Sequence, residues 1–507
     1  MINFILLANK NDKIIIKVRS GIYDIYYLFL FTRGCLMSKL INCFSRFLYS
    51  LIKKLSPSHI LILGFIFLDL IAAFLLWLPI SNKYNNISFI DAFFTATSAL
   101  SVTGLTVKNT FLQFSLFGKI IIMLLIEIGG LGFMTIITSF FIFLGKKITL
   151  KERLIIQESL NQLNYKGVVA LVKKIFYWVL IIQGIGALIL SIRFMFEKNN
   201  NFIWAIFLGV FHSISAYCNA GFDLIGTKNL SPYVGDLTIN LIIMALIFFG
   251  GVGYTVVADF LRVFRDLAYK KLSFRQKIDR LKLHSKLVIV TNAILIFTGA
   301  LLFFLYEINN NLTLKNLSFG QKILAAFFES ITTRTAGFFS IDQNSLSVNS
   351  KLLAIILMFI GGSPGSTAGG VKTVTFTVLI LSIVSAVKAK KNIEAFGRTI
   401  SFHTLQRTIA IISLNFLAIF ISTQIISLFY PEFDFIDILF EITSAVGTVG
   451  LGLGISEKVS WVFKLLICLD MIIGKVGPVS IAMLLLTKSK NSTEKLMTYP
   501  EEKIIVG

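Results

Sequence analysis

Four short stretches of the sequence combine a glycine with residues whose backbone carbonyls could hold a cation. These stretches are Val102-Thr103-Gly104, Cys218-Asn219-Ala220-Gly221, Thr335-Ala336-Gly337 and Thr448-Val449-Gly450. Glycine allows the backbone to turn so that successive carbonyls point to one side. Carbonyls that face one another around an axis can replace the water shell of a monovalent cation. A single stretch of this kind would more simply close a tight turn, as glycines in loops usually do.

The four glycines recur in register, which argues against four unrelated turns. They are 117, 116 and 113 residues apart, and a phenylalanine precedes each by nine or ten residues: Phe94, Phe211, Phe328 and Phe440. A second glycine feature follows each of them by 24 to 29 residues, in the segments 129–132, 250–253, 361–365 and 474–477. Two features that recur four times in register indicate an internal repeat.

Apolar runs show which elements must position these loops. Eight of them approach the roughly twenty residues that a bilayer requires: about 60–78, 118–143, 173–194, 237–260, 286–306, 352–386 (interrupted), 407–429 and 461–486. A shorter apolar segment with a loop glycine lies within each pair of runs: 89–106, 202–223, 319–339 and 433–454. We therefore predict an all-α integral membrane protein with four pseudo-repeats around one central pore. Each repeat is a transmembrane helix, a re-entrant pore loop and a second transmembrane helix, which makes eight spanning helices.

The repeats set the expected division of the chain. We expect a cytoplasmic or interfacial N-terminal segment, four repeats, the third with a broken second helix, and a cytoplasmic tail: 1–56, 57–145, 172–262, 285–388, 406–487 and 488–507. Met37 is an alternative start to Met1.

Composition excludes several classes of protein. Of the 507 residues, 56% are hydrophobic and 15% are charged, whereas soluble domains have roughly 45–50% and 25%. The net charge of +22 does not indicate nucleic acid, because the lysines and arginines gather at 146–174, 262–286 and 387–407. The alternation of these basic segments with apolar runs is the positive-inside bias of a multi-pass membrane protein. We therefore expect these loops and the N-terminus to be cytoplasmic and in contact with the lipid bilayer.

Chemistry other than ion passage finds little support. Four scattered cysteines favour free packing thiols over a disulfide or a metal site. The sequence shows no cluster of nucleophile, acid or metal ligands, so we expect no enzyme and no covalent cofactor. A secondary carrier for an organic solute stays open as an alternative, although the chain offers glycine turns where such a carrier needs polar midplane residues.

The segment Gly361-Gly362-Ser363-Pro364-Gly365-Ser366-Thr367-Ala368-Gly369-Gly370 interrupts an apolar run. Proline and glycine break a helix there, and the exposed polar backbone must then face a cavity. A phosphate-binding loop would need lysine directly after its last glycine and a preceding strand, but Val371 intervenes before Lys372. A flexible barrier below the four loops is the favoured interpretation, and a passive helix kink is the alternative.

This segment and the loop Arg334-Thr335-Ala336-Gly337-Phe338 resemble the Trk/Ktr/HKT superfamily of potassium transporters, most nearly its KtrB-type or TrkH-type ion-translocating subunits. The resemblance covers residues 57–490. It implies a potassium selectivity filter with one glycine-centred strand from each repeat and a gate at 361–370. It also implies a homodimer on a cytosolic nucleotide-binding regulatory subunit. Potassium would be the transported ion, with sodium as an alternative cargo, co-ion or activator.

Several charged residues accompany these segments. Lys475 stands where the family usually has an arginine that contacts the intramembrane loop, and it is assigned to the gate. Arg334 is expected to support the filter, by holding outer carbonyls or by pairing with Glu329 or Glu441. Three interpretations of Glu127 stay open: a protonated side chain, a pair with a lysine such as Lys475, or part of a cation site. His212 occupies the position in the second repeat that Glu441 occupies in the fourth, and we expect a packing or capping role for it.

Overall fold

The chain divides into two units, residues 1–56 and residues 57–507. The computed structural model describes only part of the second unit: residues 57–84, 87–143, 148–159, 167–197, 201–269, 276 and 279–477. The predicted N-terminal segment, the choice between Met1 and Met37, and the tail at 488–507 lie outside the described residues.

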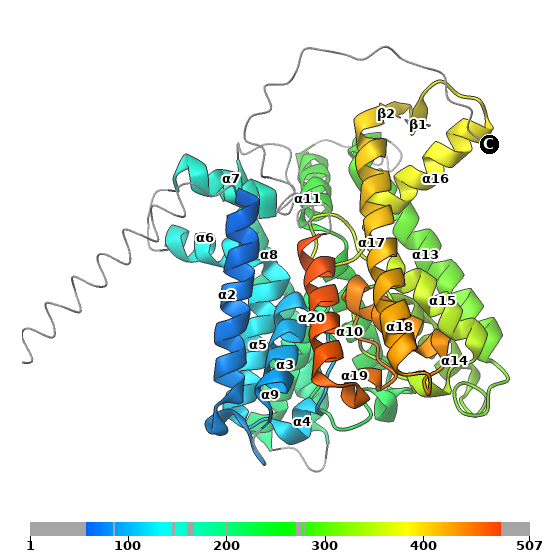
Figure 1. The fold of residues 1–507 in the computed structure, drawn as a ribbon. Coiled ribbons are helices and arrows are strands. Elements are labelled where there is room, and N and C mark those ends of the chain that lie inside the picture. Colours follow the sequence, from blue (N-terminus) through cyan, green and yellow to red (C-terminus); the bar gives the residue numbers. More distant parts are fainter. Residues whose placement is uncertain are drawn as a thin grey trace, which may run out of the picture. The chain divides into compact units, whose positions relative to one another are not determined.

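Each of the four predicted repeats begins with a long apolar helix. These helices are α2 (Pro57–Trp77), α8 (Val168–Met195), α13 (Leu283–Glu307) and α17 (Phe402–Phe429). All four are long and apolar enough to cross a membrane, since 20 helical residues extend about 30 Å. They form the long helices of Figure 1. Large apolar side chains such as Phe67, Phe74 and Phe297 are exposed on them, as on a surface that faces lipid.

A short helix follows each long one and packs against it. The short helices are α3 (Phe89–Ser101), α9 (Phe202–Cys218), α14 (Phe319–Thr332) and α18 (Phe435–Gly447). Serine caps begin two of them, because the side chains of Ser88 and Ser318 accept backbone N–H groups of the first turn. The four repeated phenylalanines lie on these helices and are fully buried. With 13 to 17 residues, the short helices cannot cross a bilayer and instead form the core.

The second helix of each of the first three repeats is divided in two. The pairs are α5 (Leu116–Leu131) with α6 (Phe133–Phe143), α10 (Leu237–Gly251) with α11 (Tyr254–Tyr269), and α15 (Val348–Phe359) with α16 (Thr373–Val387). The second pair is bent by 94°. The fourth repeat has α20 (Trp461–Val476), and the rest of its predicted span lies outside the described residues. Of these breaks, the sequence predicted only the one in the third repeat.

The second glycine feature lies at the breaks of the first three repeats and near the end of α20, and close packing explains why glycine is needed there. A Cβ added to Gly129, Gly250 or Gly474 would overlap a backbone carbonyl of Leu100, Tyr217 or Val446 respectively. Each glycine therefore lets the end of a short helix approach the second helix of its own repeat. Where the helix bends, Gly132 and Gly253 adopt φ values of +80° and +95°, which glycine tolerates best.

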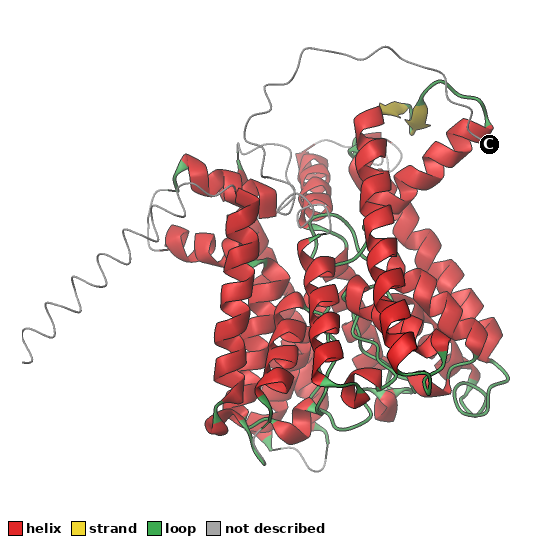
Figure 2. Cartoon of the chain, in the orientation of Figure 1, coloured by secondary structure: helices red, strands yellow, loops and turns green. Residues whose placement is uncertain are grey.

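Short elements complete the described chain (Figure 2). The helical ones are η1 (Pro79–Ser81), α4 (Thr110–Gln113), α7 (Leu150–Ser159), η2 (Ser231–Tyr233), η3 (Gln343–Ser345) and α19 (Ile455–Lys458). A hairpin of β1 (Ile393–Ala395) and β2 (Arg398–Ile400) departs from the all-α prediction for the basic segment 387–407. Its two-residue loop, Phe396-Gly397, has φ of +49° and +72°, as a type I′ turn requires.

Candidate cation pathway

The four loop glycines, Gly104, Gly221, Gly337 and Gly450, form a closed ring. In every repeat, a Cβ added to this glycine would touch or overlap the carbonyl oxygen of the residue before the next glycine: Gly104 meets Ala220, Gly221 meets Ala336, Gly337 meets Val449, and Gly450 meets Thr103. The fourth repeat thus closes on the first. We call this arrangement the glycine ring. Four segments far apart in sequence therefore surround one axis.

The backbone of each stretch has the same unusual conformation. The residue two before each glycine has a positive φ, as the glycine itself does, and the residue between them does not: Val102 (59°) and Gly104 (99°), Asn219 (61°) and Gly221 (68°), Thr335 (76°) and Gly337 (78°), Thr448 (51°) and Gly450 (95°). Alternation of left-handed and ordinary conformations turns neighbouring peptide groups to one side. A non-glycine residue there costs about 1–3 kcal/mol, so surrounding contacts must hold it.

Hydrogen bonds from the short helices supply those contacts. The N–H of the residue before each glycine donates to a carbonyl near the end of the short helix, as in Thr103 to Ser98 and Val449 to Ser444, both at 2.8 Å. Within the part of the chain that the structure describes, no turn or loop N–H donates to the carbonyls of these stretches. The carboxyl end of each helix faces the glycine ring, and its partial negative charge favours a cation there.

Four hydroxyl residues in register, which the sequence analysis overlooked, also support the ring. Ser98 and Ser444 accept the N–H of Gly104 and Gly450 at 3.0 Å. In the other two repeats the hydroxyl donates to the carbonyl that follows the glycine, from Ser215 to Phe222 at 2.8 Å and from Thr332 to Phe338 at 2.5 Å. Each hydroxyl lies five or six residues before its glycine. That spacing is the signal that could have revealed them.

Residues 360–372, which we call the intramembrane loop, lie against the same stretches. Thr367 Oγ1 donates to the carbonyl of Tyr217, just before the second stretch, at 3.3 Å. Cβ atoms added to Gly361 and Gly369 would meet side-chain atoms of Thr335 and Thr448. Further bonds join the loop to the break in the second repeat, including Ser363 N to Gly251 O at 2.9 Å and Tyr254 N to Gly365 O at 2.8 Å. The structure thus brings the predicted gate residues 361–370 together with the glycine ring.

Comparisons with known proteins agree with this architecture. The model of the TrkH cation transport protein family matches residues 31–495. The chain belongs to the TrkH family. Similar relatives include Ktr system potassium uptake protein B of Bacillus subtilis, 38% identical over 90% of this chain and 97% of the relative. Potassium/sodium uptake protein NtpJ of Enterococcus hirae is 39% identical over 90% of this chain and 98% of the relative.

A solved structure shows the same fold. The potassium transporter TrkH of Vibrio parahaemolyticus superposes with a TM-score of 0.66, at 19% identity and over 86% of each chain. The family and this fold confirm the prediction of a helical, multi-pass membrane protein built from pseudo-repeats. Membership also makes the chain a membrane cation transporter and not an enzyme.

Outside the ring, a carboxylate and a histidine hold the segments that follow the glycines of the fourth and second repeats. Glu441 accepts the N–H groups of Leu453 at 2.8 Å, Ile455 at 3.1 Å and Ser456 at 2.6 Å. His212 Nε2 accepts the N–H of Leu224 at 3.3 Å, and both acceptors lie twelve residues before the first backbone group they bind. Glu329 occupies the same place in the third repeat.

Arg334 does not pair as the sequence suggested. Its Nη2 donates to Asn292 Oδ1 on α13. Glu329 instead accepts from Gln343 Nε2 at 3.0 Å, and Glu441 is occupied by neutral backbone donors. The two carboxylates face the outer loops, whereas Arg334 reaches the long helix of its own repeat. The expected pairing of Arg334 with either carboxylate is therefore wrong.

Below the ring, Lys475 makes the loop contact that the family resemblance implies. Its Nζ donates to Thr367 O at 2.8 Å. Glu127 does not take part: Gln183 Nε2 donates to its carboxylate at 2.8 Å and Cys218 Sγ at 3.4 Å. Among the described ion pairs, none joins Glu127 to Lys475. The lysine-pair interpretation of Glu127 is therefore wrong, and the other two are untested.

Replacing Lys475 with methionine should raise ion flux. The variant keeps much of the side-chain length but loses the bond to Thr367 O, which is charge-assisted and is worth about 1.5–3 kcal/mol. We expect the initial rate of rubidium uptake to rise about fivefold or more. Lys475→Arg should keep the wild-type rate. Lys464→Met is the matched control, because Lys464 also lies on α20 and its replacement removes an ion pair with Asp91 of α3. An unchanged rate in Lys475→Met would show that this bond does not restrain the loop.

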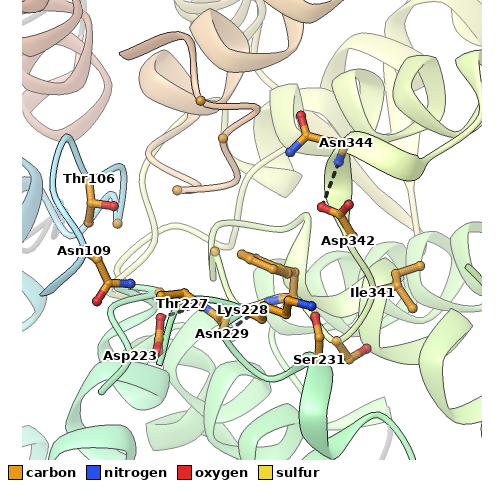
Figure 3. Close-up of a pocket in the computed structure, with 18 of the residues that line it drawn as sticks. Thr106, Asn109, Asp223, Thr227, Lys228, Asn229, Ser231, Ile341, Asp342 and Asn344 are labelled. Atoms are coloured by element: carbon orange, nitrogen blue, oxygen red, sulfur yellow. Dashed lines mark hydrogen bonds between the residues drawn. The ribbon is translucent and has the colours of Figure 1, made fainter. Parts of the chain in front are cut away.

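On the other side of the ring lies an open cavity of about 640 Å³. All four ring glycines line it, together with four carboxylates: Asp223, Asp342, Glu441 and Glu457. Figure 3 shows Asp223 beside Asn229 on one wall, and Asp342 with Asn344 on another. An excess of negative charge at the mouth raises the local cation concentration.

The cavity predicts a pH dependence. Burial raises the pKa of Asp223 to about 6, although bonds from Ile225 N and Asn229 Nδ2 partly oppose this shift. Asp223 therefore gains its negative charge as the pH on this side of the ring rises through 6. The apparent KM for rubidium should fall about two- to fivefold between pH 5 and pH 7, because one added negative charge near the path attracts the cation.

Asp223→Asn is the control for this pH dependence, because the amide keeps the side-chain shape without titrating. Burial also raises the pKa of Glu457, so the difference between the two proteins is the quantity to measure. Identical pH profiles of KM would show that the Asp223 charge does not act on the entering ion.

Proposed function

We propose that this chain is the ion-translocating subunit of a potassium uptake system, with the glycine ring as its selectivity filter. One observation carries the proposal: four repeats close on one another so that each filter glycine adjoins a carbonyl of the next repeat. Carbonyls at such a ring can replace the hydration shell of potassium. Two relatives are named potassium uptake and potassium/sodium uptake proteins, which supports the choice of ion.

In this proposal the path has three parts. Ions collect in the outer cavity, lose water at the filter and then meet the intramembrane loop as a gate. The filter comprises Val102, Thr103, Gly104, Cys218, Asn219, Ala220, Gly221, Thr335, Ala336, Gly337, Thr448, Val449 and Gly450. Residues 361–370 and Lys475 form the gate. Glu329, Glu441 and Arg334 support the filter, the last through Asn292.

Sodium is the second candidate, as cargo, co-ion or activator. The name of the Enterococcus relative includes both ions. One glycine for each strand also constrains the filter less than a longer signature would. Selectivity is therefore a quantity to be measured in the same experiment as flux.

The wider assembly follows from charge and family resemblance. We propose that the basic loops and the N-terminus face the cytoplasm of a cell with a bacterial-type inner membrane, according to the positive-inside rule. The subunit would form a homodimer and bind a cytosolic nucleotide-binding regulatory protein. The four repeats would occupy 57–145, 172–262, 285–388 and 406–487.

Rubidium flux into proteoliposomes that contain the purified chain tests the function. We expect uptake that external potassium inhibits, measured against a sodium titration and repeated with any co-purifying cytosolic subunit. Empty liposomes provide the background. Uptake of an organic solute without rubidium flux would contradict the proposal. Equal inhibition by sodium and potassium would favour a non-selective or sodium pathway.

A further inference from the structure

A buried amide on α13 joins the third filter stretch to the intramembrane loop. Asn292 Oδ1 accepts from Arg334 Nη2, and Asn292 Nδ2 donates to Ser363 Oγ at 3.2 Å. These three side chains have exposed fractions of only 3%, 8% and 0%. An amide can accept on one atom and donate on the other, so a single side chain serves both neighbours.

Ser363 is a fixed point of the loop. Its backbone N–H donates to Gly251 O at 2.9 Å. Its carbonyl accepts from Ser366 Oγ at 2.7 Å, and its hydroxyl lies 3.3 Å from that of Thr373. A displacement of the loop must therefore move Ser363 and strain its bond to Asn292.

Arg334 is the corresponding point on the filter. It directly precedes Thr335, whose φ of +76° belongs to the alternating filter conformation. The other three stretches have serine, cysteine and glycine at the place of Arg334: Ser101, Cys218 and Gly447. Only the third filter stretch thus carries a side chain long enough to reach outward to a spanning helix.

The surroundings of Asn292 favour this arrangement. The residue also lines a cavity of about 560 Å³ between α8, α10, α11 and α13, where apolar side chains such as Phe249, Val288 and Phe297 predominate. Turning the amide into that cavity would place a polar group among apolar ones. It would also leave the guanidinium without this acceptor, and Arg334 Nε already has no partner among the described residues.

We propose that Asn292 couples the gate to the filter as a positioning residue. Its amide keeps the third filter strand in its conducting shape while the gate loop is closed, and loop movement changes the hold on Arg334. The inference rests on the filter and gate assignments of the proposed function. It adds a residue outside the pore through which movement of the gate affects the filter.

Two substitutions separate the two ends of this bridge. Ser363→Ala removes the hydroxyl that Asn292 binds but leaves Asn292 Oδ1 to accept from Arg334, whereas Asn292→Leu loses both bonds. In proteoliposomes, both variants should carry rubidium about fivefold faster, as for the loss of one hydrogen bond. Only Asn292→Leu should also lower the rubidium-to-sodium flux ratio about fivefold. A role in packing alone would not distinguish the two variants in this way.

A double-mutant cycle with Ser363→Ala completes the test. Ser363→Ala should raise flux in the wild-type background and have no further effect in Asn292→Leu, because the shared bond is already absent. The matched control is Asn415→Leu, since Asn415 is equally buried on α17 but donates to Ile411 O of its own helix. If the effects of the two substitutions multiply while the wild type carries rubidium, the coupling is wrong and the proposed function still holds. Absence of rubidium flux in the wild type would overturn the proposed function and the coupling with it.

Discussion

Replacing Gly450 with aspartate should abolish rubidium uptake. The φ of +95° at Gly450 is strained for any side chain, at a cost of about 1–3 kcal/mol. In addition, a Cβ there would overlap the carbonyl of Thr103 and lie 2.9 Å from the Cα of Gly104. The ring can accommodate this atom only by moving the first strand away from the axis. We expect uptake to fall more than about 100-fold, since each 1.36 kcal/mol is a factor of ten.

Gly454→Asp is the matched control for this experiment. Gly454 follows Gly450 by four residues and has a similar φ of +84°, but a Cβ there meets nothing within 4 Å. Both variants therefore bear similar backbone strain, and only one obstructs the ring. Uptake should survive in Gly454→Asp, and Gly104→Asp should reproduce the loss. If Gly450→Asp transports normally at equal expression in potassium-transport-deficient cells, the filter assignment is wrong.

The register of repeated residues made much of this fold predictable. Glycine spacing alone predicts four loops around one axis, because a ring of repeats needs equivalent residues at equivalent positions. The apolar runs located the four long helices, and α2 and α17 lie within a few residues of the predicted ranges. The break at 361–370 was evident because it concentrates proline, glycine and serine in an apolar run.

Other features depend on contacts that no single stretch reveals. The bend between α10 and α11 follows Gly250, which packs against the carbonyl of Tyr217, a residue of another helix. Arg334 binds Asn292 and not a carboxylate, whereas backbone N–H groups bind Glu441 and the amide of Gln343 binds Glu329. Charge alone suggested the wrong partners, since a buried carboxylate can be satisfied by N–H groups. The β-hairpin at Phe396-Gly397 is local, but turn chemistry does not predict it, because a type I′ turn favours asparagine, aspartate or glycine where this loop has phenylalanine.

Deleting Ser363–Gly369 should raise flux about tenfold or more. Within the deleted segment, the N–H of Ser363 and the hydroxyl of Thr367 donate to carbonyls of the second repeat. The carbonyl of Thr367 accepts from Lys475 of α20. Each of these bonds contributes about 0.5–1.5 kcal/mol, or more where a charge takes part, so together they favour the closed position by several kcal/mol. Removing the segment removes both the obstruction and the bonds that keep it in place, and the initial rate of rubidium uptake measures the result.

The geometry of the loop suggests that the shortened chain can still fold. Ile360 and Val371 pair as a β-bridge, and Thr373 N donates to Gly362 O at 3.0 Å, so the two ends of the deletion lie side by side and need only a short connection between Gly362 and Gly370. Combining the deletion with Gly450→Asp supplies the control, because flux through the filter must fall again, whereas a leak around the protein would not. An unchanged flux in the single deletion, in protein of normal thermal stability, would remove the gate hypothesis. A raised flux that Gly450→Asp abolishes would place the barrier and the ring in series on one path.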